Sequence, residues 1–187
     1  PYHVKTTQSL DVNRSVSTWD FSNGAGQQFR SRALTSAGYL SSEVEFDIMG
    51  GEVKTYNPYT VPGLTDNVPA GVEFTEVVQR DGLGRPTQVK LQDGTSVYSY
   101  FNEEMVTVAY PAPDSSQVVG IASRSKDQAN KEHRRIIDSL GRVIRVDEPT
   151  TNGLGPVAAP NQPTFYKYDG NNNLAKAIQS DGANTQE

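Results

Sequence analysis

The sequence has no cysteine among its 187 residues, two histidines and a single tryptophan. The absence of cysteine excludes disulfides and thiolate metal sites, and it leaves the redox compartment open. No apolar run approaches the roughly 18 residues that a membrane-spanning helix requires. The 17 Lys and Arg residues, against 22 Asp and Glu, form no basic run, so the charge pattern does not support nucleic-acid binding.

The sequence is also poor in residues that build a core. Hydrophobic residues make up 35% of the chain with Tyr counted, whereas typical globular chains have roughly 45–50% with Gly counted. Nine Tyr, six Phe and many Val nevertheless favour strands, and a net charge of −5 does not predict disorder. We therefore expect one domain, or two small ones, with less core than the length suggests. The chain starts Pro-Tyr, without Met or a signal peptide, and we expect it to be an excised piece of a longer protein.

A turn signature recurs along the chain: Asp or Asn, two further residues, then Gly or Asn. Six segments carry it, at 23–27 (NGAGQ), 47–51 (DIMGG), 81–85 (DGLGR), 127–131 (DQANK), 138–142 (DSLGR) and 169–173 (DGNNN). An Asp at the first position accepts hydrogen bonds from backbone N–H groups ahead of it, and the fourth position needs the left-handed region that Gly and Asn tolerate. The Asp-Gly pairs at Asp93 and Asp181 predict two-residue type I′ turns.

The residues that we expect to form the turns in the repeat region are Asp47, Gly50, Asp81, Gly84, Arg85, Asp93, Gly94, Asp127, Asn130, Asp138, Gly141, Arg142, Asp169 and Asn172.

The segments between the turns have the period-two pattern of strands. Residues 85–91, 95–101 and 164–168 alternate between two faces of mixed polar and aromatic character. Residues 123–138 have the charge of a solvated helix but lack an apolar stripe, and they contain one of the turns, so we predict a hairpin there. The proline-containing segments 57–71, 110–120 and 148–163 predict irregular surface loops. The expected fold is all-β, a meander of antiparallel hairpins that forms a curved, open sheet.

The turn signatures resemble the YD repeats of the RHS family, which includes bacterial RHS proteins, the C components of insecticidal Tc toxins, and teneurins. The family consensus is roughly Tyr-Asp-x-x-Gly-Arg-Leu, followed by a later Asp-Gly. It is matched at 168–174 (YDGNNNL), 80–86 (RDGLGRP) and 137–143 (IDSLGRV), and more loosely at 46–53 (FDIMGGEV). We therefore expect degenerate YD repeats over residues 46–187 and a separate N-terminal β segment over residues 1–45.

The repeats depart from the consensus at two positions. The tyrosine is replaced by Phe46, Arg80 and Ile137 in three copies, and the arginine by Gly51 and Asn173 in two.

The resemblance implies hairpins that wind into a spiralling sheet, which in bacterial members closes into a shell around a toxic C-terminal polypeptide. This chain would then be a structural, non-catalytic piece of a larger encapsulating or surface-displayed scaffold, in an extracellular or cell-surface bacterial protein. Such a wall would face solvent on both sides. Its free edges would pair with neighbouring repeats, a capping segment or a copy of the chain, and an enclosed C-terminal polypeptide is a further expected partner.

The residues that could carry chemistry have simpler structural explanations. A catalytic site at His133 would need an organised nucleophile, and the sequence has no Gly-x-Ser-x-Gly elbow. The DGLG segment at 81–84 lacks the third Gly of a phosphate loop. The segments 169–173 and 65–67 lack the spaced carboxylates and closing Glu of a calcium loop, and the family's self-cleaving aspartyl protease site has no counterpart here. We expect no enzyme activity, cofactor or metal.

Two pairs of tyrosines carry the alternative function, a glycan-binding or adhesion module. Tyr98 with Tyr100, and Tyr166 with Tyr168, each place two rings on one face of a strand. Such rings stack on sugars, and they also pack against one another across strands, which is the explanation we favour. We expect Trp19 to be a core anchor rather than a sugar platform.

Overall fold

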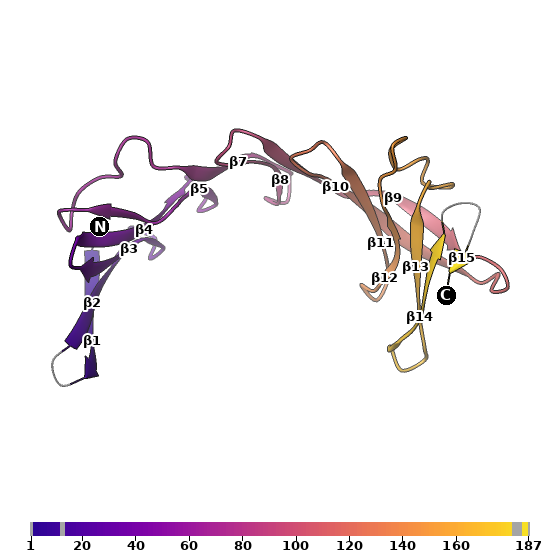
Figure 1. Ribbon diagram of the computed structural model, residues 1–187, viewed down its shortest axis with the longest axis horizontal. Coiled ribbons are helices and arrows are strands. Elements are labelled where there is room, and N and C mark those ends of the chain that lie inside the picture. The colour runs from indigo at the N-terminus through magenta and orange to yellow at the C-terminus, as the bar shows by residue number, and fades with distance from the viewer. Residues whose placement is uncertain (1, 12–13, 181–184, 187) are drawn as a thin grey trace. The chain divides into compact units, whose positions relative to one another are not determined.

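The computed structural model describes residues 2–11, 14–180 and 185–186. In these ranges the regular structure is entirely β, with fifteen strands and no helix (Figure 1). The predicted all-β meander of antiparallel hairpins is confirmed. Within these ranges there is no helix long and apolar enough to cross a membrane.

The chain divides into two compact units, Pro1–Thr95 and Ser96–Glu187. This division falls inside the repeat region. The division at residues 45 and 46, which rests on where the repeat signatures begin, stays a prediction.

The first unit follows the chain order in space, with one short detour. Its strands are β1 (Tyr2–Asp11), β2 (Arg14–Ser22), β3 (Gln28–Thr35), β4 (Gly38–Phe46), β5 (Glu52–Tyr56), β6 (Tyr59–Val61), β7 (Phe74–Arg80) and β8 (Pro86–Lys90). Neighbours are antiparallel in the order β1-β2-β3-β4-β5-β7-β8. One half of β4 pairs with β5, and the other half pairs with β6. Residues 59–61 are thus a strand with Tyr59 and Val61 buried, and the predicted loop was wrong at this point.

The interior of the first unit is built from alternating aromatic and basic side chains. Trp19 on β2 faces Arg32 on β3, which faces Ser41 on β4. Trp19 is buried and meets Tyr39 edge-on at 5.4 Å, as expected of a core anchor. Arg32 has no exposed surface, and its Nη1 donates to the carbonyl oxygen of Gly63 at 2.7 Å, while further bonds reach the carbonyls of Leu64 and Asp66. Arg32 therefore fixes the long connection between β6 and β7 to the sheet.

The second unit is also a meander. Its strands are β9 (Ser96–Ala109), β10 (Gln117–Lys126), β11 (Glu132–Asp138), β12 (Val143–Asp147), β13 (Pro163–Tyr168), β14 (Leu174–Ser180) and β15 (Thr185–Gln186), adjacent in that order. β10 and β11 pair from Gly120–Asp138 to Lys126–Glu132, which confirms the predicted hairpin in place of a helix. The order does not return to its first strand among the described residues, so this sheet is open.

A hydrophobic core covers one face of the sheet in the second unit. Five strands contribute aliphatic side chains, and β13 contributes Phe165; the cluster consists of Val106, Val108, Tyr110, Ala122, Ile136, Ile144, Phe165 and Ile178. The connection between β12 and β13 supplies Val157, which packs on this cluster, and buried Leu154. The expectation that the wall faces solvent on both sides was wrong for this unit, because the 148–163 segment folds over the sheet instead of leaving it bare.

The sheet of the second unit curls around this core. The hydroxyl of Tyr110, beyond the end of β9, donates to the carbonyl of Tyr166 on β13 at 2.7 Å, although three strands separate β9 from β13. Lys167 on β13 also pairs with Asp114 in the β9–β10 connection. These contacts tie the β9–β10 connection to β13.

Buried arginines attach the β12–β13 connection to the sheet. Asp147 is fully buried, and its Oδ2 accepts from Arg134 at 3.1 Å and from Arg145 at 3.0 Å. Arg145 Nε lies 2.8 Å from Asp147 Oδ1, but its N–H does not point at that oxygen, so this contact is ionic rather than a hydrogen bond. The two arginines also donate to the carbonyls of Gly155 and Val157. A buried ion pair is costly unless its remaining groups are satisfied. These carbonyls satisfy one donor of each arginine, whereas Arg145 Nε and Asp147 Oδ1 make no hydrogen bond within the described part of the chain.

Gly120 is required by the packing of the core. A Cβ at this position would lie 2.6 Å from both Ile136 Cγ2 and the backbone oxygen of Ile137. We predict that Gly120→Ala lowers the free energy of unfolding by about 1–3 kcal/mol because of overpacking. The matched control is Gly170→Ala, which meets nothing within 4 Å. Urea unfolding of both variants is the measurement, and equal midpoints would contradict this account of the core.

Candidate functional site

The recurring turns are held by the side chain of their first residue. Asp81 Oδ1 accepts from the backbone N–H groups of Leu83 and Arg85, both at 2.9 Å. Asn23, Asp47, Asp138 and Asp169 make the same pair of bonds, to the third and fifth residues of their turns. Asp127 accepts from the fifth residue, Lys131, at 2.8 Å. One oxygen thus satisfies N–H groups that have no partner strand at a chain reversal.

The fourth residue of each turn adopts the left-handed conformation. The φ angles are 82° at Gly50, 80° at Gly84, 61° at Asn130, 78° at Gly141 and 69° at Asn172. The N–H of this residue donates to the carbonyl of the first residue, for example from Gly84 to Asp81 at 2.9 Å. Asn occurs here because it tolerates this region better than other residues with a side chain.

The Asp93-Gly94 pair forms the same five-residue turn, displaced by two residues. Gly94 donates to the carbonyl of Leu91 at 3.0 Å, and Leu91 donates to that of Thr95 at 2.8 Å. Gly94 has a φ of 83°, whereas Asp93 is not among the residues with positive φ. The predicted type I′ turn was therefore wrong, since Asp93 is the third residue of its turn and accepts from Thr95 instead. The second Asp-Gly pair, Asp181-Gly182, lies outside the described residues.

The fifth residue completes the turn with its side chain. Arg85 Nε donates to Asp81 Oδ2, and Arg142 Nε donates to Asp138 Oδ2, both at 2.7 Å. Burial acts to raise the pKa of both carboxyls, but the bonds from arginine and from backbone N–H groups prevail, so the pKa of each lies below its usual value. In the last turn, backbone and side-chain bonds from Asn173 lower the pKa of Asp169.

Fifth-position side chains also connect neighbouring turns that lie at the same end of the strands. Because the strands are antiparallel, every second reversal lies at the same end of the strands. Gln27 Nε2 donates to the carbonyl of Gly50 at 3.0 Å, and Arg142 Nη1 donates to Asn172 Oδ1 at 3.1 Å. Each of these bonds links one turn to the next turn at that end of the strands.

Three of the four candidate tyrosines are covered by a cation. On β9, Tyr98 lies opposite Lys126 and Tyr100 opposite Arg124, with the cations 5.8 Å and 4.4 Å from the ring centroids. Arg142 lies 4.9 Å from the ring of Tyr168.

Further polar bonds fix this arrangement. The Tyr168 hydroxyl donates to the carbonyl of Val143 at 3.0 Å. Bonds to Glu103 and Glu132 hold Arg124 in place, and the bond to Glu103 is the main cause of its raised pKa. The cross-strand partners of Tyr98 and Tyr100 are therefore cations. Glycan contact by Tyr98, Tyr100, Tyr166 and Tyr168 stays a prediction.

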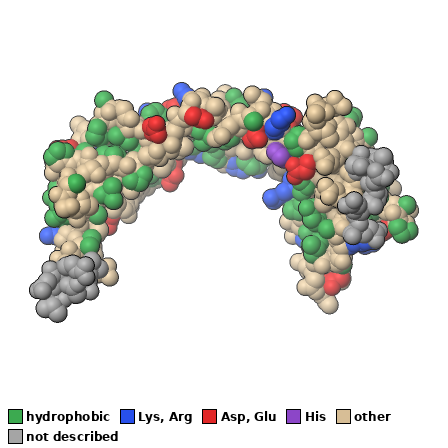
Figure 2. Space-filling view, viewed as in Figure 1, with side chains coloured by type: hydrophobic (Ala, Val, Ile, Leu, Met, Phe, Trp, Pro, Cys, Tyr) green, Lys and Arg blue, Asp and Glu red, His purple; other side chains and the backbone are tan. Residues whose placement is uncertain are grey.

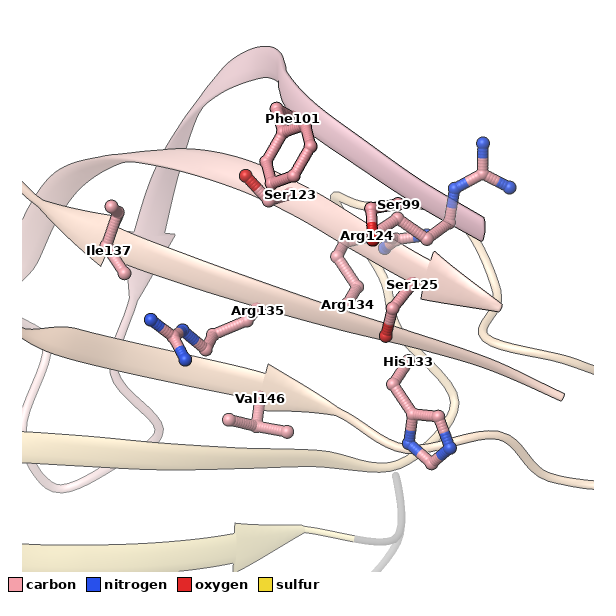
Figure 3. A pocket seen from close by; sticks show the side chains of 10 residues that line it. All are labelled: Ser99, Phe101, Ser123, Arg124, Ser125, His133, Arg134, Arg135, Ile137 and Val146. Atoms are coloured by element: carbon pink, nitrogen blue, oxygen red, sulfur yellow. The ribbon is translucent and has the colours of Figure 1, made fainter. Parts of the chain in front are cut away.

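His133 lies in a pocket on the face of β9–β12 that the core does not cover. Ser125 and His133 face each other on adjacent strands, but the imidazole points away from Ser125 (Figure 3). Its Nδ1 lies 2.7 Å from Glu148 Oε2, so the ring links β11 to the start of the β12–β13 connection. In the described ranges, no group of three or more His, Cys, Asp or Glu side chains is placed to hold a metal ion.

Positive and negative side chains are interspersed on the visible surface (Figure 2).

Sequence reasoning missed a buried polar cluster in the first unit. Arg30 binds Glu43 through two bonds of 2.7 Å, and the Tyr59 hydroxyl donates to the same carboxylate at 2.5 Å. Burial, followed by the bond to Glu43, raises the pKa of Tyr59. The alternation of Arg30 and Arg32 on one face of β3 was the available signal, but the partner on β6 lies in a segment predicted as a loop.

Solved structures of TcdB2-TccC3 complexes share this fold. The structure named TcdB2-TccC3-TEV matches 94% of the chain with a TM-score of 0.60 and 18% identity, and it shows the RHS-type shell fold. TcdB2-TccC3 without its hypervariable C-terminal region matches 95% with a TM-score of 0.61 and 16% identity, and TcdB2-TccC3 matches 94% with 0.59 and 17%. The chain spans about 10% of the length of each. No protein-family model and no curated protein matches the sequence.

These matches confirm the predicted resemblance to Tc toxin components at the level of the fold.

The turn carboxylates give a stability test. Asp138 is buried, and its removal would leave the N–H groups of Leu140 and Arg142 without acceptors. We predict that Asp138→Ala lowers the free energy of unfolding by about 1–3 kcal/mol. Asp138→Asn should cost less, because an amide oxygen makes the same two bonds in the Asn23 turn. Thermal unfolding checks the order of the variants, with Ser139→Ala as the control, and an equal effect of Ala and Asn would contradict it.

Asp114 gives a pH test. Its bonds to Lys167 and Ser116 lower its pKa from 3.8 to about 2. A carboxyl with a depressed folded-state pKa contributes stability that is complete above its unfolded value and is lost as the pH falls through the folded value. We therefore predict that the stability difference between the wild type and Asp114→Asn is constant above about pH 5 and shrinks between about pH 4 and 2. Chemical unfolding across this range measures it, and a difference that grows on acidification would refute the assignment.

Proposed function

We propose that the chain is a structural segment of the wall of a larger bacterial scaffold and that it has no catalytic role of its own. The observation that carries this proposal is the series of identically bonded turns, in which Asp81, Asp138 and Asp169 each organise a chain reversal. A fold shared over 94% of the chain with TcdB2-TccC3, of which it spans about 10%, supports the same role. A secreted or surface-displayed location is part of this proposal.

The outer strand of the first unit is the proposed point of assembly. β1 pairs with β2, and the strand order begins with it, so its other edge offers backbone groups to a further strand. Tyr2 and Val4 on this strand are 61% and 60% exposed. We propose that a neighbouring repeat or a second copy of the chain adds there as an antiparallel strand.

A C-terminal polypeptide is the proposed cargo of the scaffold. One of the matched structures is TcdB2-TccC3 without its hypervariable C-terminal region, so that protein has such a region. By analogy, we propose that the wall to which this chain contributes serves a C-terminal polypeptide of its own parent protein.

Light scattering after size exclusion tests the assembly edge. The isolated chain should associate with rising concentration, and Val4→Lys should weaken association by placing a charge at the open edge. Val78→Lys is the matched control, since Val78 is 46% exposed on the inner strand β7. A chain that stays monomeric at all concentrations would contradict edge pairing, and turnover in a broad hydrolase screen would contradict the non-catalytic role.

A further inference from the structure

The turn at 47–51 has no side chain at its fifth position, where other turns have a side chain that binds their first residue. Its fifth residue is Gly51, where Arg85 and Arg142 bind the carboxylate of their own turns. Gly51 does not have a positive φ, so the backbone conformation does not demand glycine. The reason for glycine at this position must therefore lie in the space around it.

The carboxylate of Asp47 and the guanidinium of Arg80 together bound that space. A Cβ on Gly51 would lie 2.9 Å from Asp47 Oδ2 and 3.3 Å from both Cζ and Nη2 of Arg80. Arg80 is the last residue of β7 and belongs to the next hairpin. An arginine from the neighbouring hairpin thus lies beside the position from which a fifth-residue side chain would start.

Arg80 joins the two turns through backbone carbonyls. Its Nη2 donates to the carbonyl of Glu52, directly after the first turn, and its Nη1 donates to the carbonyl of Gly84 in the second turn at 2.9 Å. A planar guanidinium with donors at fixed angles suits such a bridge, whereas a lysine ammonium presents a single point charge.

The bridge lies where the strand pairing has ended. The register of β5 and β7 runs from Tyr56–Phe74 to Lys54–Glu76 and is not continued toward the turns. The chain between these strands makes the detour through β6, so no short loop holds the two hairpins together. The bonds of Arg80 therefore connect the two hairpins near their turns, where β5 and β7 are not paired through backbone hydrogen bonds.

We propose that Arg80 is an inter-hairpin staple that replaces the missing fifth-position arginine of the 47–51 turn, and that Gly51 is required to admit it. This explains two departures from the YD consensus together, since Arg80 stands at the tyrosine position of one repeat and Gly51 at the arginine position of the repeat before it. Gln27 and Arg142 link neighbouring turns from the fifth position forward, whereas Arg80 makes the link in the reverse direction. The staple is a nearest-neighbour coupling between repeats.

A swap of the two residues tests the staple. The variants are Arg80→Tyr and Gly51→Arg, each of which restores the consensus, and the double variant. Each single change should lower the urea midpoint, the first by removing the bridge and the second by crowding Arg80. The double variant should recover most of the loss, because the new arginine can bind Asp47 within its own turn. Gly82→Arg is the control, since a side chain at Gly82 meets nothing within 4 Å.

Hydrogen exchange keeps the test decisive if a single variant folds poorly. Arg80→Lys retains the charge but cannot span both carbonyls, so exchange at the amides of Gly50, Gly51 and Gly84 should rise about tenfold while that of β10 and β11 is unchanged. Losses that add in the double variant, a Gly51→Arg variant as stable as Gly82→Arg, or unchanged exchange in Arg80→Lys would each overturn the proposal.

Discussion

The structure depends on one local interaction that recurs at five chain reversals, the acceptance of two backbone N–H groups by the side-chain oxygen of an Asp or Asn. In the turns led by Asp47, Asp81, Asp138 and Asp169, this oxygen satisfies donors that would otherwise have no partner. The turns are therefore defined by a few polar residues at fixed spacing, with little help from apolar burial. A chain with 35% hydrophobic residues can form long antiparallel hairpins for this reason.

The two units supply the remaining stability in different ways. The first alternates rings with cations, so that Arg32 lies between Trp19 and Ser41 and the bidentate Arg30–Glu43 pair is buried beside Phe21. The second buries aliphatic side chains and folds its long connection over them, with Arg145 and Asp147 enclosed beneath. The first unit therefore has fewer buried aliphatic side chains than the second, and polar and cation–π contacts take the place of such side chains there.

Links between neighbouring turns give a physical meaning to repeat degeneracy. At the consensus position, Arg85 and Arg142 each bind the carboxylate of their own turn. Asn173 takes this role within its own turn, and Arg80 stands beside the Asp47 turn from the next hairpin. At both turns another residue stands where the consensus places arginine, and at the Asp47 turn it comes from the next hairpin, which a pattern read one repeat at a time does not reveal.

The sequence by itself determined the all-β class, the places where the chain reverses and the left-handed residues at Gly84, Gly141 and Asn172, because these depend on short-range backbone chemistry. The hairpin over 123–138 was predictable for the same reason. Only the tertiary structure decided the type of the Leu91–Thr95 turn, the strand β6, the covered face of the second unit and the bridge made by Arg80. These features join residues that are distant along the chain or depend on strand register, and no local pattern carries that information.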